Sequence, residues 1–202
     1  MKTLKLYINE ALHVNKNTKI TEYNYHPKTN GELNKLVRKL IKERGKNADL
    51  NDIDTSEITD MSHVFFELEF NGDISEWDVS NVKDMHAMFM GAKFAGDISN
   101  WNVSNVQNMS GMFYDTKFNG DISKWDVGNV KDMYSVFTFS QFNKDISKWD
   151  VSNVKNMTNM FARSKFNGDI SDWDVSNVKN MDNIFYKSPL EKNPPKWYNI
   201  YK

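Results

Sequence analysis

The chain has 202 residues and a net formal charge of −1, so no global charge directs it to nucleic acid or to a membrane surface. The charge is nevertheless uneven, because residues 1–45 hold ten Lys and Arg against four Asp and Glu, and the remainder holds sixteen against twenty-three. The absence of cysteine excludes disulfide frameworks, thiolate nucleophiles and zinc-thiolate sites. Packing must therefore supply the stability.

The N-terminal stretch MKTLKLYINE does not have the pattern of a secretory signal. Lys5 and Asn9 interrupt an apolar run that would need about 7–15 residues. The sequence also contains no run of about 20 apolar residues that would predict a membrane-spanning helix. We therefore expect no membrane insertion, and a cytoplasmic or virion-associated chain rather than a classically secreted one.

Residues 1–45 predict an N-terminal α+β capping module. Residues 1–28 have the alternation of extended segments, and Thr29 to Glu32 has the spacing of a capping box. A helix over residues 30–44 follows, with an apolar stripe that we expect to cover the first repeat: Leu33, Leu36, Val37, Leu40 and Ile41. The other face is basic, with Lys35, Arg38, Lys39, Lys42 and Arg44. We favour a solvated face there over contact with nucleic acid or an acidic protein, and the acidic repeats are a further candidate neighbour.

A tryptophan recurs every 24 residues, which predicts a repeat solenoid. These residues are Trp77, Trp101, Trp125, Trp149 and Trp173. Five full repeats over residues 70–189 lie between a degenerate first repeat, 46–69, and a degenerate C-terminal capping repeat, 190–202, in which Trp197 keeps the tryptophan position. Atypical end repeats are expected where an open stack must be closed.

Two patterns follow one another in each repeat. In EWDVSN, residues 76–81, Trp and Val alternate with polar residues, which predicts a short parallel strand. In VKDMHAMF, residues 82–89, the apolar spacing changes to 3 and 4, which predicts a short helical or 3₁₀ turn. The predicted fold class is thus a leucine-rich-repeat-like solenoid of short parallel strands and short helical turns.

Most of the repeated polar residues have structural interpretations. Asp84 and its counterparts precede the predicted turn as N-cap residues. The Asn81 column is expected to bond backbone groups inside each bend. Asn71-Gly72 marks a tight turn, but Ala95 and Lys144 interrupt that pattern and argue against a strict need for positive φ.

One repeated column, Asp78, Asn102, Asp126, Asp150 and Asp174, has two interpretations. Strands stacked in register would place these side chains about 4.8 Å apart. Such a ladder of carboxylates could hold calcium or meet a basic partner. Alternatively, Asp-Val-Ser-Asn favours a local Asx turn, which is the interpretation we prefer.

Catalytic and cofactor chemistry is not indicated. His63 and His86 fall at neighbouring positions of adjacent repeats and could approach each other, but two imidazoles without a third ligand make a weak metal site. The sequence lacks phosphate-binding, dinucleotide-binding and zinc-binding helix motifs. We therefore expect a non-enzymatic protein without a catalytic residue, metal or cofactor.

The repeated motif F-N-x-D-I-S-x-W-D-V-S-N-V-x-D/N-M-x-x-M-F resembles the BspA-like leucine-rich repeat family, in the variant found in bacterial surface proteins and mycoplasma lipoprotein-type proteins. The resemblance covers roughly residues 46–202. It implies a right-handed leucine-rich-repeat-like solenoid that is used for adhesion or protein recognition. Surface members carry an export signal and an anchor, and neither pattern is seen here.

Recognition is expected at the positions that vary between repeats. On the predicted strand the variable positions are Glu76, Asn100, Lys124, Lys148 and Asp172. On the turn they pair as His86 with Met90, Ser110 with Tyr114, Tyr134 with Thr138, Thr158 with Ala162, and Asp182 with Tyr186. The candidate partner-binding residues are Met90, Tyr114, Tyr134, Phe139 and Tyr186, together with Asp78, Asp126, Asp150 and Asp174. The alternative is that these Tyr and Met side chains pack over neighbouring turns.

These features predict a protein that recognises a macromolecular partner, in an adhesion-like manner, through its repeat surface. The alternative is a structural component of a phage or other particle that self-associates through the solenoid or its head. A third class, an enzyme or metal protein, would depend on His63 or His86.

Overall fold

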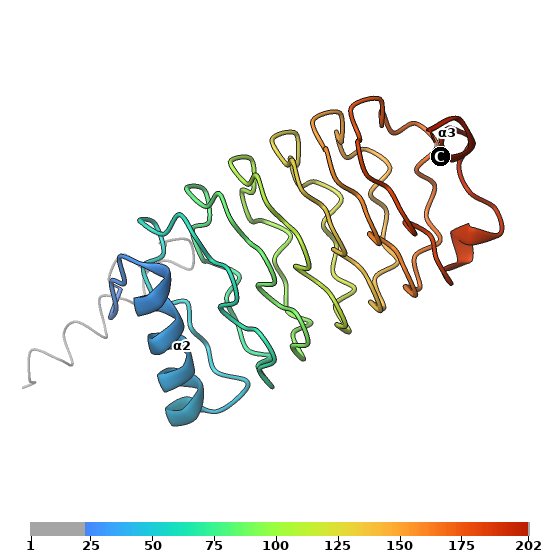
Figure 1. The fold of residues 1–202 in the computed structure, drawn as a ribbon. Helices are drawn as coiled ribbons and strands as arrows, with labels where there is room; N and C mark the ends of the chain where they lie inside the picture. The colour runs from blue at the N-terminus through green and yellow to red at the C-terminus, as the bar shows by residue number, and fades with distance from the viewer. Residues whose placement is uncertain (1–22, 202) are drawn as a thin grey trace, which may run out of the picture.

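The computed structural model describes residues 23–201, and the extended segments predicted within residues 1–22 lie outside that range. Three short elements occur in it: the helix α2, Asn30–Arg44; the 3₁₀ helix η2, Pro189–Glu191; and the helix α3, Lys196–Tyr201. Between them the chain winds as a stack of similar irregular coils, with α2 at one end and α3 at the other (Figure 1). The predicted repeat solenoid is confirmed at this level.

The short strands predicted at residues 76–81 and their counterparts are wrong. Trp77 N–H donates to the Ile74 carbonyl at 3.2 Å and Val82 N–H donates to the Val79 carbonyl at 3.0 Å, so this stretch consists of successive turns. Each turn directs one apolar side chain inward, which reproduces the alternation of a strand. Over residues 23–201 adjacent coils are joined instead by isolated parallel bridges, such as that between Asp84 and Asn108.

The predicted helical turn at residues 82–89 is also wrong. Alternate backbone N–H groups donate to the next coil: Met85 N–H to Asn108 O at 2.9 Å and Ala87 N–H to Ser110 O at 2.8 Å. The N–H of Met88, which follows Ala87, closes a turn on the Met85 carbonyl instead. A helix requires right-handed dihedrals throughout, whereas Ala87 has a φ of 51°. The spacing of 3 and 4 therefore arises from consecutive turns.

Asx turns recur three times in each coil from Asp49 to Asn156, and the last repeat has them at Asp169 and Asp174. In the coil that follows Phe70, the carboxylates of Asp73, Asp78 and Asp84 each accept a hydrogen bond from the N–H two residues further along, at 2.7–2.9 Å. The capping geometry predicted for Asp84 is therefore present, although it begins a turn and not a helix.

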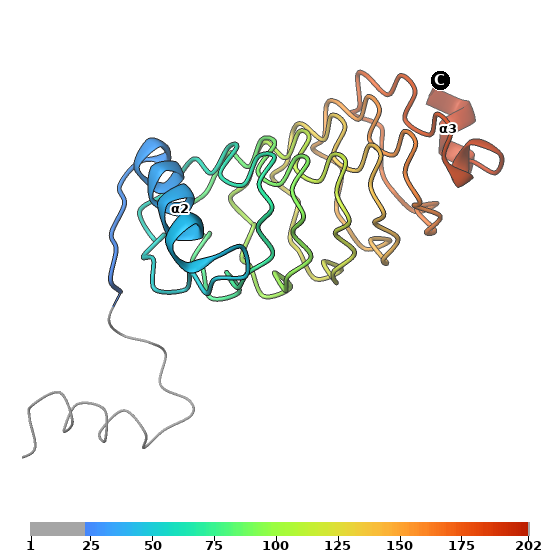
Figure 2. The same cartoon turned by 90° about the horizontal axis from the view of Figure 1, so that it is seen from below.

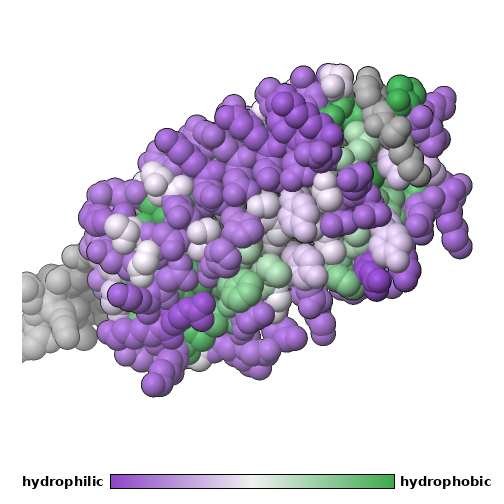
Figure 3. All heavy atoms as spheres, in the orientation of Figure 1, coloured by the Kyte–Doolittle hydropathy of each residue, from purple (hydrophilic) through white to green (hydrophobic). Residues whose placement is uncertain are grey.

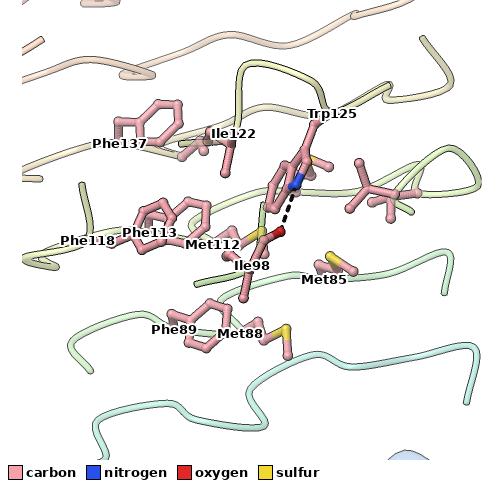
Figure 4. Packing of buried hydrophobic residues seen from close by; sticks show 14 of the residues in the cluster. Met85, Met88, Phe89, Ile98, Met112, Phe113, Phe118, Ile122, Trp125 and Phe137 are labelled. Carbon is pink, nitrogen blue, oxygen red and sulfur yellow. Dashed lines mark hydrogen bonds between the residues drawn. The ribbon is translucent and has the colours of Figure 1, made fainter. Parts of the chain in front are cut away.

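Two columns of phenylalanine and one of tryptophan fill the interior. The Phe113 and Phe137 rings stack with centroids 5.8 Å apart, and Phe113 also stacks on Phe118 of its own coil at 4.4 Å. Trp125 is 4% exposed and donates its Nε1–H to the Ile98 carbonyl at 3.1 Å (Figure 4). The same bond recurs for each repeated tryptophan, so the indole column joins successive coils.

The helix α2 covers the first coil, as its apolar stripe predicted (Figure 2). Leu33, Val37 and Leu40 are fully buried. Thr29 accepts from Glu32 N–H at 3.2 Å, and the Glu32 carboxylate accepts from the Lys28 N–H at 2.7 Å. The helix thus begins with a variant of the predicted capping box, and its apolar face shields the end of the stack from water.

The C-terminal segment covers the other end of the stack. Trp197, in α3, donates its Nε1–H to the Ile170 carbonyl at 2.8 Å, and Leu190, in η2, is buried. Among residues 23–201, no helix is long and apolar enough to cross a membrane.

Candidate functional site

We call turn face the surface made by the positions equivalent to 86, 90 and 91 in each coil. Positions 85, 88 and 89 of the same segment point into the core and are buried. Three large hydrophobic side chains on the turn face are exposed: Tyr134 by 43%, Phe139 by 41% and Tyr186 by 39%. Figure 3 shows that hydrophobic and near-neutral residues gather in a band along one side of the molecule, bordered by hydrophilic residues.

A line of aromatic and cationic groups crosses four coils of the turn face. The ring of Tyr114 meets the edge of Phe139 at 5.7 Å between centroids. The Arg163 guanidinium lies 5.3 Å from the Phe139 centroid and 5.5 Å from the Tyr186 centroid, and Lys187 Nζ lies 5.1 Å from the Tyr186 centroid. These contacts hold the side chains in a defined arrangement on the surface.

The charges also act on the phenol of Tyr186. A hydrogen bond from Lys187 and the positive charges of Lys187 and Arg163 lower the pKa of Tyr186 below its ordinary value. The phenolic oxygen of Tyr186 is therefore placed to accept hydrogen bonds from the two cationic side chains.

The structure brings together Tyr114, Phe139 and Tyr186 through Arg163, and it leaves Tyr134 apart from that line. Met90 is half-buried on the same face. The predicted i, i+4 pairing does not describe the surface, because Ser110, Thr138 and Ala162 are buried. That pairing assumed a helix, and the segment is a run of turns.

Phe139 has an unusual backbone conformation for a bulky residue. Its φ is 58°, in the left-handed region, where Gly91 lies in the equivalent position with a φ of 68°. A residue with a Cβ costs roughly 1–2 kcal/mol there. The aromatic ring is thus displayed at a position where the fold itself would favour glycine.

Arg163 is the residue that the sequence reasoning missed. The available signal was spacing, since residues 139, 163 and 187 lie one repeat apart and place a cation beside an aromatic ring in adjacent coils.

The two candidate histidines do approach each other. The His63 and His86 rings lie 4.8 Å apart, and His63 also contacts Phe66 at 5.4 Å. His86 Nδ1 is 2.7 Å from Ser110 Oγ, so one of its nitrogens is already engaged. Among the described residues no group of three or more metal-ligating side chains occurs.

The Asp78 column adopts the local hydrogen bonds that we preferred. Asp78, Asp126, Asp150 and Asp174 each accept from the backbone N–H two residues on, at 2.9–3.0 Å. The hydrogen bond from the Ser152 side chain, and to a smaller extent that from the Ser152 backbone N–H, lower the pKa of Asp150 below its ordinary value. In residues 23–200 no hydrogen bond or ion pair joins this column to the aromatic line of the turn face. The two predicted sets are therefore separate surfaces.

The asparagine columns bond between coils and not inside each bend, which corrects the expectation for Asn81. Its Nδ2 donates to the Ser56 carbonyl at 2.8 Å, and Asn105, Asn129, Asn153 and Asn177 repeat this bond. Asn108 Nδ2 also donates to Asp84 Oδ2 at 3.2 Å. These side chains stabilise the stack and are not available as ligands.

The basic head contacts the acidic first coil. Arg44 makes two hydrogen bonds of 2.9 Å to the Asp52 carboxylate, which lower the pKa of Asp52 and raise that of Arg44. His26 lies 3.1 Å from Asp54, and Lys28 pairs with Glu57. The remaining basic residues of α2, Lys35, Arg38, Lys39 and Lys42, are exposed.

Comparison with known proteins finds one family along the repeats. Its two overlapping matches cover residues 33–141 and 116–200. No curated protein and no solved structure was found to match the chain. Two successive matches agree with a stack of equivalent coils, and the chain belongs to the family described as Mycoplasma protein of unknown function, DUF285.

Proposed function

We propose that this protein is a non-enzymatic recognition module that binds a macromolecular partner, a protein, through the turn face. The observation that carries the proposal is the line of Tyr114, Phe139, Arg163 and Tyr186 on a molecule whose other phenylalanines are mostly buried. Aromatic residues and arginine are enriched among the residues that dominate binding energy at protein interfaces.

Two properties of this line favour binding over packing. The rings hold one another, so little side-chain freedom remains to be lost when a partner docks. Phe139 is also 41% exposed while Tyr114 and Arg163 hold its ring, so it offers apolar area that the coil itself does not bury.

The proposal assigns no catalysis to the repeated polar residues. The Asp78 and Asp84 columns are engaged in Asx turns, and the Asn81 column is engaged between coils. These roles account for their recurrence without substrate chemistry.

A finer assignment within this proposal is a BspA-like leucine-rich repeat used for adhesion. Its support is the repeated motif, the period of 24 residues and the parallel register of adjacent coils. The alternative is a structural component of a phage or other particle that assembles through the solenoid or its head. End-to-end stacking is the less favoured form of it, because α2 covers the first coil and Trp197 covers the last one.

The test replaces Tyr114, Tyr134 and Phe139 together by Ser and measures capture of partner proteins from host-cell lysate. We expect the circular dichroism spectrum to be retained and capture of a stoichiometric partner to fall at least about tenfold, as for the loss of interface aromatic residues. A matched control replaces Lys124 and Lys148, which are exposed elsewhere on the coils, by Ser. Capture unchanged in the aromatic variant would move the site away from the turn face.

A further inference from the structure

In one column of the turn face the side-chain charge changes from negative to positive along the solenoid. From the first coil to the last, the positions equivalent to Gly91 are occupied by Glu67, Gly91, Asp115, Phe139, Arg163 and Lys187. Within residues 23–200 neither Glu67 nor Asp115 forms an ion pair. The acidic side chains thus lie on one side of Phe139 and the basic ones on the other.

This order is self-complementary. Two copies related by a two-fold axis meet through the same surface, and the contacts are reciprocal. Suppose that the axis lies in the plane of the turn face, perpendicular to the solenoid axis, and passes through the coil of Phe139. The second copy then runs in the opposite direction, so its coils are in reverse order, but each of its columns faces the same column of the first copy. Asp115 of one copy then faces Arg163 of the second copy, and the reciprocal pair forms as well.

The spacing allows this match. The stacked core rings place the coil of Phe113 at 5.8 Å and the coil of Phe161 at 5.7 Å on either side of Phe137. Asp115 and Arg163 are therefore at equal distances, one coil each, from the central Phe139.

Side-chain size is matched around the same centre. In the column of position 90, Tyr114 lies one coil before the centre and Ala162, which is small and buried, lies one coil after it. In the column of position 86, His86 lies two coils before the centre and Asp182 lies two coils after it, so an imidazole would face a carboxylate. The central residues, Tyr134 and Phe139, are exposed aromatics that would meet their own counterparts.

We propose that a second copy of this chain docks antiparallel on the turn face, with residues 132–141 of both copies at the two-fold axis. This names the partner of the recognition surface and rests on the function proposed above. If the partner had a different sequence, the turn face would have no need to match its own charges and side-chain sizes on the two sides of the Phe139 coil.

The dimer is expected to be weak. The complementary positions form three columns of one short segment in five coils, whose core rings are spaced 5.7–5.8 Å apart around the centre. We expect so narrow a contact to bury less than the roughly 800 Å² per partner that stable complexes bury. The association should therefore be measured over a concentration series that extends to the millimolar range.

The experiment reverses the charges of the central pair and measures self-association by sedimentation velocity at low salt. The variants are Asp115→Arg, Arg163→Asp, the double variant, and an equimolar mixture of the two single variants. Both positions have left-handed backbones, and Asp and Arg each already occur at one of them, so folding should be retained. Glu76→Arg and Lys148→Glu are the controls, because they make similar charge changes at exposed positions outside the turn face.

We expect each single variant to self-associate at least about tenfold more weakly, since like charges would then face each other twice. The mixture should form a heterodimer and the double variant should recover the wild-type association, while both controls stay unchanged. A wild-type chain that is monomeric at every concentration, or single variants that associate as the wild type does, would overturn the proposal. Capture of a different protein through the aromatic residues would in that case leave the recognition function standing.

Discussion

Phe137 and Phe139 lie two residues apart in one coil and have opposite roles. Phe137 is fully buried and stacks between Phe113 and Phe161, whereas Phe139 is 41% exposed and contacts Tyr114 and Arg163. The first belongs to a column that every repeat shares, and the second to a column in which every repeat differs. The same residue type thus builds the solenoid in one place and marks its surface in the other.

The largest expected effect comes from truncating the buried member of this pair. Phe137→Ala removes the central ring of a stacked column, and such changes cost about 3–5 kcal/mol in the free energy of unfolding. Phe139→Ala should cost less than about 1 kcal/mol, because the residue is 41% exposed and its removal opens no cavity in the core. Urea denaturation of both variants measures the difference, and equal losses would show that the turn face is part of the core.

The next effect concerns the tryptophan column. Trp125→Phe keeps a ring in the core but removes the indole donor to the Ile98 carbonyl, which still accepts from the Trp101 N–H, and the loss of one such hydrogen bond costs about 0.5–1.5 kcal/mol. Tyr134→Phe is the matched control, since it removes a hydroxyl from an exposed ring. We expect that control to stay within about 0.5 kcal/mol of the wild type in thermal denaturation. If Tyr134→Phe lost as much stability as Trp125→Phe, the stabilising role assigned to the bond between Trp125 and the Ile98 carbonyl would be contradicted.

A smaller effect on stability is expected when Phe139 is replaced by glycine. Phe139→Gly releases the left-handed strain of about 1 kcal/mol but also loses the contacts of the ring and adds freedom to the unfolded chain. The free energy of unfolding should change by less than about 1 kcal/mol, while partner binding should fall. Binding that survives this substitution would remove Phe139 from the site.

The smallest expected effect per residue is the loss of stability in acid at the Asx turns of Asp121 and Asp145, which lie outside the turn face. Backbone hydrogen bonds from Ser123 and Ser147 lower the pKa of Asp121 and Asp145 below the ordinary value of 3.8. Their contribution to stability is therefore complete above that value and is lost as the pH falls below it.

An Asp121→Asn and Asp145→Asn variant should retain the Asx turns, because Asn102 accepts the same kind of bond. Between about pH 5 and about pH 3 its unfolding temperature should fall less than that of the wild type. Parallel curves for the two proteins would show that these carboxylates do not contribute.

Much of the fold could be predicted from local pattern. The helix of residues 30–44, its buried stripe and the repeated core follow from periodicity and capping, which depend on neighbours in sequence. The strands and helical turns were wrong because consecutive turns produce the same apolar spacing as those elements. Left-handed positions such as His63 and Arg163 are occupied by residues that do not signal such a backbone.

The candidate site was predictable by residue but not by arrangement. Variation between repeats identified Tyr114, Phe139 and Tyr186, since constant positions build the coil. The role of Arg163 depends on contacts between coils, 24 residues apart in sequence, which the local pattern does not report.

The central claim is that the turn face is the binding surface, and site-specific photo-crosslinking tests it most directly. A photoreactive phenylalanine is placed at Phe139, and in a second protein at the exposed Lys124 outside the turn face. Both proteins are irradiated in host lysate and alone at high concentration. The account predicts crosslinks to a defined partner, including a second copy of the chain, from position 139 and none from position 124. Crosslinks from position 124 alone, or equally from both, would contradict it.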